Sequence, residues 1–168
     1  MMSELHIGTK LVLATLMARA DYNNYRGWAL PVDEDGSDEG YLIEYVDGGE
    51  SNHPNHKGYI SWSPVAVFNV AYKSSGNLTF GMAIEAMKRG RRVARSGWNG
   101  KGMWIILNEG RTVESLEPNS FYDKCGFKAP VFIGSHIDMK AADGSMVVGW
   151  LASQTDMLAE DWCIVEFF

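Results

Sequence analysis

The stretch Arg91–Leu107, RRVARSGWNGKGMWIIL, places two strand-like segments on either side of a glycine-rich turn. Arg91–Ser96 precedes the turn, with Val93 expected to point inward, and Asn99-Gly100 within it is a strong hairpin signal. Met103–Leu107 follows the turn with apolar side chains on both faces. This pattern predicts a strand covered on both sides, by a helix on one face and by another protomer on the other.

The same turn has the chemistry of a ligand site. Gly97, Gly100 and Gly102 permit positive φ and close approach of a ligand to the backbone. The indole of Trp98 can stack on a base, and Lys101 can meet a phosphate. An ordinary hairpin connection is the alternative interpretation, and the turn alone does not separate the two.

The segments around this hairpin complete a helix-and-sheet pattern. Thr79 is placed to cap a helix that runs to about Arg89, and Ala142–Gly144 is a second hairpin signal. Glu109–Lys128 is expected to be mostly loop. The remaining segments are two strands flanking the second hairpin, a short turn or helix and a closing strand: Val131–Met139, Ser145–Leu151, Ser153–Asp156 and Trp162–Phe167. A helix packed on an antiparallel sheet is the economical arrangement, so the predicted fold class is α+β.

The N-terminal half is predicted to be a separate domain, because Lys73–Asn77 is a run of small polar residues typical of a linker. We place the domains at 1–75 and 78–168. In the first domain we expect strands at Lys10–Met17 and Tyr41–Val46, with a short helix capped by Asp21 between them at Tyr22–Arg26. A second helix is expected to start at Ser63-Pro64 and to have Val67, Phe68 and Ala71 on one face. Each small sheet is thus expected to pack with a short helix.

Composition excludes several classes of protein. The 168 residues are 46% hydrophobic and 21% charged, which is typical of a globular protein. Residues 1–76 carry five Lys and Arg against ten Asp and Glu, and residues 77–168 carry ten against eleven. The basic footprint of a duplex nucleic-acid binder is therefore missing, and a small anion would need a local pocket.

No metal, cofactor or membrane association is predicted. Cys125 and Cys163 lack metal-ligand spacing, and no signal peptide or membrane-spanning run is evident, so we expect reduced thiols in a cytosolic protein. Asp33–Glu39 lacks the spacing of a calcium loop and is better explained as a solvated acidic loop. His53 and His56 lack further ligands for zinc, and we expect a turn with exposed histidines.

The C-terminal half contains three separated blocks, Phe80–Gly90, Val93–Trp104 and His136–Gly144 with Ala152–Trp162. Together these blocks, which span about residues 78–167, resemble one family of small phage proteins, the Thoeris anti-defence two family. The resemblance implies an oligomeric sponge, a homotetramer, that sequesters a signal of the glyco-cyclic ADP-ribose type made by TIR-domain proteins. Similar sponges bind the cyclic dinucleotides of CBASS defence. The cytoplasm of an infected bacterium is the implied location.

The N-terminal half resembles the phage gp49-type small proteins. The resemblance rests on Arg26–Pro31, Gly40–Tyr45 and the Ser61-Trp62-Ser63-Pro64 segment with Phe68. That family has no settled biochemical role. The resemblance therefore implies a phage context and no particular chemistry.

An ADP-ribose-like ligand needs three kinds of group, and the C-terminal half offers all three. Trp98 or Trp104 can stack on the base. Cations and amide donors for the diphosphate are available from Arg95, Lys101 and the backbone around Gly100. Partners for the ribose hydroxyls are Asn99, Gln154, Thr155 and Asp156. The family resemblance maps the contacts onto the segments Trp98–Lys101 and Ser153–Asp156.

Other roles remain open for several of these residues. Trp104 and Trp162 lie in strand patterns that favour a core or an interface, and Asp156 could instead cap the following turn. His136 and Asp138 could form a buried polar pair or the acid and base of a cyclic nucleotide or ADP-ribose hydrolase. A phage structural or protein-binding module is a third alternative. Because no nucleophile elbow or Walker loop is present, we predict binding without turnover.

Overall fold

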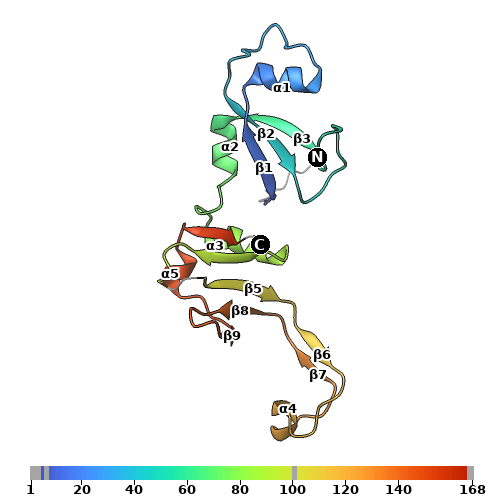
Figure 1. Cartoon of the computed structure of the whole chain (residues 1–168), viewed down its shortest axis with the longest axis vertical. Helices are drawn as coiled ribbons and strands as arrows, with labels where there is room; N and C mark the ends of the chain where they lie inside the picture. Colours follow the sequence, from blue (N-terminus) through green and yellow to red (C-terminus); the bar gives the residue numbers. More distant parts are fainter. Residues whose placement is uncertain (1–4, 6–7, 100–101, 166–168) are drawn as a thin grey trace. The chain divides into compact units, whose positions relative to one another are not determined.

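The computed structural model describes residues 5, 8–99 and 102–165. The chain divides into two compact units, Met1–Lys73 and Ser74–Phe168, called here unit 1 and unit 2 (Figure 1). Gly100 and Lys101, both expected ligand contacts, lie outside the described residues. Among the described residues, no helix has the length and apolar character needed to cross a membrane.

Unit 1 is a three-stranded antiparallel sheet with two helices. The strands follow the order β1-β2-β3, and Tyr22, Leu42 and Ile60 form the buried centre. The elements are β1 (Val12–Leu16), α1 (Arg19–Arg26), β2 (Gly40–Tyr45), β3 (Ile60–Pro64) and α2 (Val65–Ala71).

Both helices of unit 1 differ from their predictions. α1 begins at Arg19 and has Ala18 at its N-cap, so the expected capping role of Asp21 is wrong. The amide of Ala20 instead donates to the carbonyl of Gly36 in the acidic loop, which satisfies this end of the helix through the backbone. α2 has no buried residue, and Val67 is 61% exposed. Only Phe68 of its expected inner face packs closely, between Tyr41 and Tyr72.

His53 and His56 of unit 1 are packed rather than exposed. The ring of Tyr25 stacks on His53 at 4.4 Å, and its hydroxyl lies 2.9 Å from Nε2 of His56. Nδ1 of His56 lies 2.8 Å from a carboxylate oxygen of Glu44. The expectation of a turn with exposed histidines is therefore wrong. Across the described residues, no cluster of three or more His, Cys, Asp or Glu side chains could hold a metal ion.

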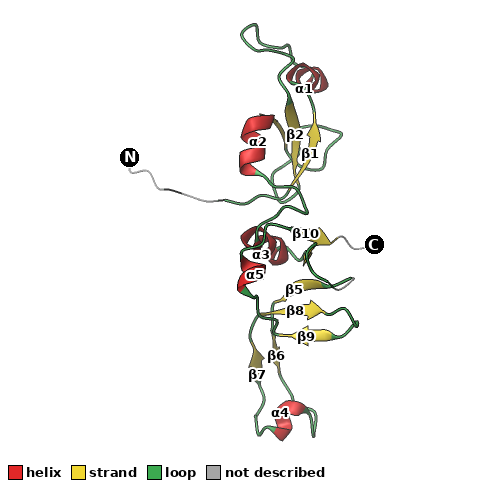
Figure 2. Cartoon of the chain, turned by 90° about the vertical axis from the view of Figure 1, so that its left-hand side faces the viewer, coloured by secondary structure: helices red, strands yellow, loops and turns green. Residues whose placement is uncertain are grey.

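Unit 2 is built on a five-stranded antiparallel sheet, which confirms the α+β class. The strand order is β10-β4-β5-β8-β9, and Figure 2 shows α3 and α5 together on one side of these strands. The elements are α3 (Phe80–Lys88), β4 (Arg92–Arg95), β5 (Trp104–Asn108), β8 (His136–Lys140), β9 (Met146–Val148), α5 (Gln154–Met157) and β10 (Trp162–Val165). As predicted, Thr79 caps α3, and its hydroxyl accepts from the amide of Met82.

The sheet of unit 2 has one packed face and one open face. Val93 pairs with Ile105, Ile105 pairs with Met139, and all three join Ala83 and Met87 of α3 in the core. Because strand side chains alternate, the neighbouring positions lie on the opposite face. That open face carries residues of β4, β5, β8 and β9: Arg92, Trp104, Ile106, Asp138, Lys140, Met146 and Val148.

An extension of the β5–β8 hairpin occupies the region expected to be loop. It contains β6 (Arg111–Val113), α4 (Phe121–Lys124) and β7 (Val131–Ile133). The strand expected over Val131–Met139 is divided at Gly134-Ser135 into β7 and β8. At this break the hydroxyl of Ser135 donates to the carbonyl of Glu109, which holds the two connecting segments together in place of ladder bonds.

Candidate functional site

The site is built on the first turn of α5, where Ser153 and Asp156 form a reciprocal cap. The Ser153 hydroxyl accepts from the amide of Asp156 at 3.1 Å, and the amide of Ser153 donates to Oδ2 of Asp156 at 3.2 Å. The hydroxyl also donates to Oδ2 at 2.6 Å. A four-residue helix needs such a cap because most of its amides lack a partner within the helix. The cap occupies one carboxylate oxygen of Asp156 and leaves the other available.

The second oxygen of Asp156 ties α5 to the glycine-rich turn. Oδ1 accepts from Nη1 of Arg95 at 2.8 Å and from the indole nitrogen of Trp98 at 3.1 Å. Arg95 ends β4, and Trp98 lies in the turn that follows. The two segments of sequence expected to contact a ligand are therefore side by side.

Arg95 is held between two carboxylates. Its Nε donates to Oδ1 of Asp161 at 2.8 Å, and Oδ2 of Asp161 accepts from the amide of Gly97 at 2.8 Å. Only 13% of the Arg95 side chain is exposed. Hydrogen bonds to Asp161 and then to Asp156 raise the pKa of Arg95, and Arg95 in turn lowers the pKa of Asp161. With two anionic partners, Arg95 acts as an anchor for the turn rather than as a free cation.

Asp156 stays ionised well into the acid range. Burial alone would raise the pKa of its carboxyl group, but hydrogen bonds from Ser153, Arg95 and Trp98 outweigh that effect and lower the pKa to about 2. The capped helix and the anchored turn therefore depend on one charged group.

Trp98 also belongs to a cluster of three indoles. Its ring lies edge-on to Trp162 at 5.4 Å and to Trp150 at 6.1 Å, and it packs against the core of unit 2. Trp162 is completely buried, which confirms its predicted place in the core. The indole nitrogen of Trp162 donates to the carbonyl of Asp156 at 3.0 Å, so the cluster supports α5 as well.

The exposed members of the site lie around this anchor. Asn99, Gln154 and Thr155 are exposed, and the carbonyl of Thr155 faces Nη1 of Arg95 at 3.4 Å. A Cβ at position 97 would lie 2.7 Å from a carboxylate oxygen of Asp161, so a larger residue there would displace the carboxylate that accepts from the Gly97 amide. The turn and the start of α5 thus present polar side chains on a rigid support.

Comparison with known proteins assigns unit 2 to a family. Residues 78–165 match the family model of the Thoeris anti-defense 2-like domain. The chain belongs to this family. Thoeris anti-defense 2 of Bacillus phage SP01 is 43% identical over 88 residues, which are 52% of this chain and 94% of that protein. The sequence-based family assignment of the C-terminal half is confirmed, and the gp49-type resemblance of the N-terminal half stays a prediction.

Three candidate residues of the Thoeris anti-defense 2-like domain, Trp104, His136 and Asp138, lie away from the anchor, on the open face of the sheet. Trp104 pairs with Lys140 in the register of β5 and β8, and the guanidinium of Arg92 lies 5.1 Å from its ring. His136 and Asp138 lie on the same face, with Nε2 3.3 Å from Oδ1. Nδ1 of His136 lies 2.8 Å from the carbonyl of Gly134, and Asn108 donates to the other oxygen of Asp138 at 3.0 Å.

Sequence reasoning missed two residues of the site, Asp161 and Trp150. Asp161 is 66 positions from Arg95, and no local pattern connects them. Both residues do fall in or beside the blocks that carry the family resemblance. The signal that could have found Asp161 is charge: Arg95 has no acidic neighbour in sequence, and a partly buried arginine needs one.

Proposed function

We propose that this protein counters the Thoeris defence by binding its signal, a nucleotide of the glyco-cyclic ADP-ribose type, and withholding it from the host without cleaving it. The family membership of unit 2 supports an anti-defence role. The main observation in favour of this binding site is the carboxylate of Asp156, which bonds to Arg95, to Trp98 and to the cap of α5. It supports a site formed by the turn 97–102 and the first turn of α5.

In this proposal the anchored residues and the exposed residues have different tasks. Arg95, Trp98 and Asp156 are positioning residues, because their polar atoms are already paired with one another. Asn99, Gln154 and Thr155 contact the ribose hydroxyls, and amides of the turn with Lys101 meet the diphosphate. The pre-formed anchor lowers the conformational entropy lost on binding, which favours the high affinity that a stoichiometric sponge needs.

The hydrolase alternative receives less support from the site chemistry. Both ring nitrogens of His136 face acceptors, Gly134 on one side and Asp138 on the other, so neither is directed at an outside substrate. The pair also lies on the opposite sheet face from Arg95 and Trp98. Cyclic dinucleotides of the CBASS type are the second candidate class of ligand, and the titration described next is repeated with them.

The test of the proposed function measures binding and recovery of the ligand. The full-length protein is titrated with glyco-cyclic ADP-ribose by calorimetry, and the complex is then heat-denatured and the nucleotide identified by mass spectrometry. Saturable binding followed by release of intact ligand is expected. Conversion of a molar excess of ligand into product would instead identify an enzyme, and the absence of binding would remove the proposal.

Matched threonine variants test the location of the site. Thr155→Ala removes an exposed hydroxyl at the start of α5 and should weaken binding by about fivefold to tenfold, the effect of one hydrogen bond. Thr112→Ala removes an equally exposed hydroxyl in β6 and should leave affinity unchanged. Equal affinities in the two variants would argue against a role for α5.

A further inference from the structure

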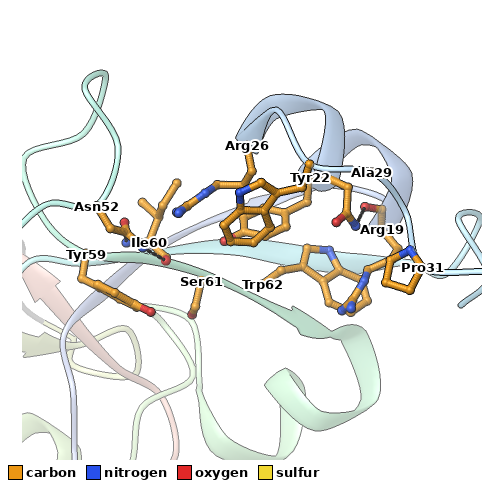
Figure 3. Close-up of a pocket in the computed structure, with 12 residues that line it drawn as sticks. Arg19, Tyr22, Arg26, Ala29, Pro31, Asn52, Tyr59, Ile60, Ser61 and Trp62 are labelled. Atoms are coloured by element: carbon orange, nitrogen blue, oxygen red, sulfur yellow. Dashed lines mark hydrogen bonds between the residues drawn. The ribbon is translucent and has the colours of Figure 1, made fainter.

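Unit 1 contains a cavity of about 520 Å³ in which its arginines and tryptophans converge (Figure 3). Residues 1–73 hold two arginines and two tryptophans, and all four line this cavity. The guanidinium carbon of Arg26 lies 4.3 Å from the ring centre of Trp28, and that of Arg19 lies 4.7 Å from the ring of Trp62. We call this cavity the arginine–tryptophan pocket.

The pocket has walls that are fixed by their own hydrogen bonds. Asn52 exchanges two bonds with the backbone of Ile60, at 2.9 and 2.8 Å, and the indole nitrogen of Trp62 donates to the carbonyl of Met17 at 2.9 Å. Arg19 is ion-paired with Glu34. The amide of Asn52 and the indole nitrogen of Trp62 are thus satisfied and shape the pocket, whereas Nε of Arg19 is buried without a hydrogen-bond partner among the described residues despite the ion pair.

In the part of the chain that the structure describes, Arg26 differs from Arg19 in its lack of a carboxylate partner. Its Nη1 is buried and has no hydrogen-bond partner, and within the described residues no carboxylate forms an ion pair with it. A buried guanidinium nitrogen without an acceptor is costly, and the cost is removed when an anion binds. In Figure 3 the side chain of Arg26 extends from α1 toward Ile60 at the start of β3.

Aromatic surface is available beside this cation. Trp28 is 52% exposed and lies edge-on to Tyr22 at 6.2 Å, and Tyr59 is 46% exposed. Half-exposed indole and phenol rings next to an arginine are the partners that a base and its phosphate use in proteins. The strongly acidic balance of residues 1–76 opposes a polyanion, so a ligand with a single phosphate fits better than a nucleic acid.

We propose that the arginine–tryptophan pocket binds a small aromatic anion of the nucleoside monophosphate class, with the phosphate on Arg26 and the base against Trp28. This site lies wholly within unit 1 and does not depend on the function proposed for unit 2. The volume of the pocket lies within the range of small-molecule sites in proteins.

The test titrates the full-length protein with AMP, using calorimetry and the indole N–H signals in a ¹H–¹⁵N spectrum. Saturable binding that shifts the signals of Trp28 and Trp62 is expected. Adenosine alone and inorganic phosphate alone should each bind at least about tenfold more weakly, because each lacks one of the two contacts. No saturable binding of AMP would overturn the proposal, as would shifts confined to Trp98, Trp150 and Trp162.

Two variants that each remove one positive charge test whether AMP binds in the pocket or responds only to the overall charge of unit 1. Arg26→Gln should weaken AMP binding at least about tenfold, whereas Lys57→Gln, at an exposed position outside the pocket, should not. If Arg26→Gln melts at a lower temperature, Trp28→Ala gives the decision, because its half-exposed ring is not part of the buried centre. Unchanged affinity in a folded Trp28→Ala or Arg26→Gln protein would overturn the proposal.

Discussion

At the scale of single residues, Trp98 is held by its ring and by its nitrogen. The ring packs with Trp150 and Trp162, and the nitrogen donates to Asp156. We predict that Trp98→Ala lowers the free energy of unfolding by about 2–4 kcal/mol, somewhat below the loss for a fully buried ring. Trp98→Phe keeps most of the packing and should cost about 1–2 kcal/mol for the lost hydrogen bond and the smaller ring.

Chemical denaturation of both variants measures these losses. Ligand affinity is then compared only under conditions where each variant is fully folded. A Trp98→Ala protein with wild-type stability would show that the indole is not needed for the core, and a stacking role for Trp98 would regain support.

Asp156 gives the protein an acid-dependent stability. Because its pKa in the folded protein is about 2, below its usual value near 3.8, the carboxylate stabilises the fold above pH 4, and this contribution is lost as the pH falls through about 2. After allowance for solvent screening we expect about 1 kcal/mol. The free energy of unfolding, measured by denaturant between pH 5 and pH 2, should fall less steeply in Asp156→Asn than in the wild type. Glu114→Gln, an exposed control, should keep the wild-type slope.

At the scale of elements, the open face of the unit 2 sheet predicts association. Val148 is 71% exposed, and Ile106 and Trp104 lie on the same face. Exposed apolar side chains gathered on one face of a sheet are typical of an interface. We predict a homotetramer by light scattering and a smaller species for Val148→Lys. Val70→Lys, at an 85% exposed position of unit 1, should leave the mass unchanged. A wild-type monomer at all concentrations would contradict this prediction.

The elements predicted correctly from the sequence are those with local signals. Thr79 before an amphipathic run marks the start of α3, and the serine and aspartate of Ser153–Asp156 have the spacing of a cap. The hairpin of β8 and β9 carries an Asp143-Gly144 turn. In these places a few neighbouring residues determine the backbone, so the sequence is sufficient.

The features that differ from the prediction, such as the start of α1 and the pairing of β6 with β7, depend on contacts between distant residues. α1 begins before Asp21 because the acidic loop returns to its amides, and β6 with β7 forms only as an extension of the β5–β8 hairpin. The hydrogen bonds that hold Arg95 in the site also join residues that are distant in sequence. The turn and α5 were each predicted as ligand contacts, but the pairing of Arg95 with Asp156 and Asp161 joins positions about 60 residues apart.

At the scale of the whole molecule, the division into two units predicts that unit 2 folds without unit 1. The hydroxyl of Ser75 accepts from the amide of Ile164 at 2.9 Å, and the amide of Gly76 donates to the carbonyl of Trp162 at 3.0 Å. We predict that a fragment beginning at Ser74 folds and keeps the ligand affinity of the full chain. A fragment beginning at Leu78 lacks both bonds and should be about 1–2 kcal/mol less stable.

Calorimetric melting and ligand titration of the two fragments measure these effects. A well-folded fragment from Ser74 that has lost all affinity for the signal would show that residues of unit 1 complete the site. Equal stability of the two fragments would show that Ser75 and Gly76 do not contribute to the fold.

The three indoles of Trp98, Trp150 and Trp162 also have an optical consequence. Their ring centres lie 5.4 to 6.5 Å apart and their planes cross at steep angles, so their electronic transitions couple and give a strong near-ultraviolet circular dichroism signal. Trp98 is bonded to the same carboxylate that supports α5. A ligand that shifts the turn by a fraction of an ångström should therefore alter the spectrum, and the protein should report its own occupancy without any attached label.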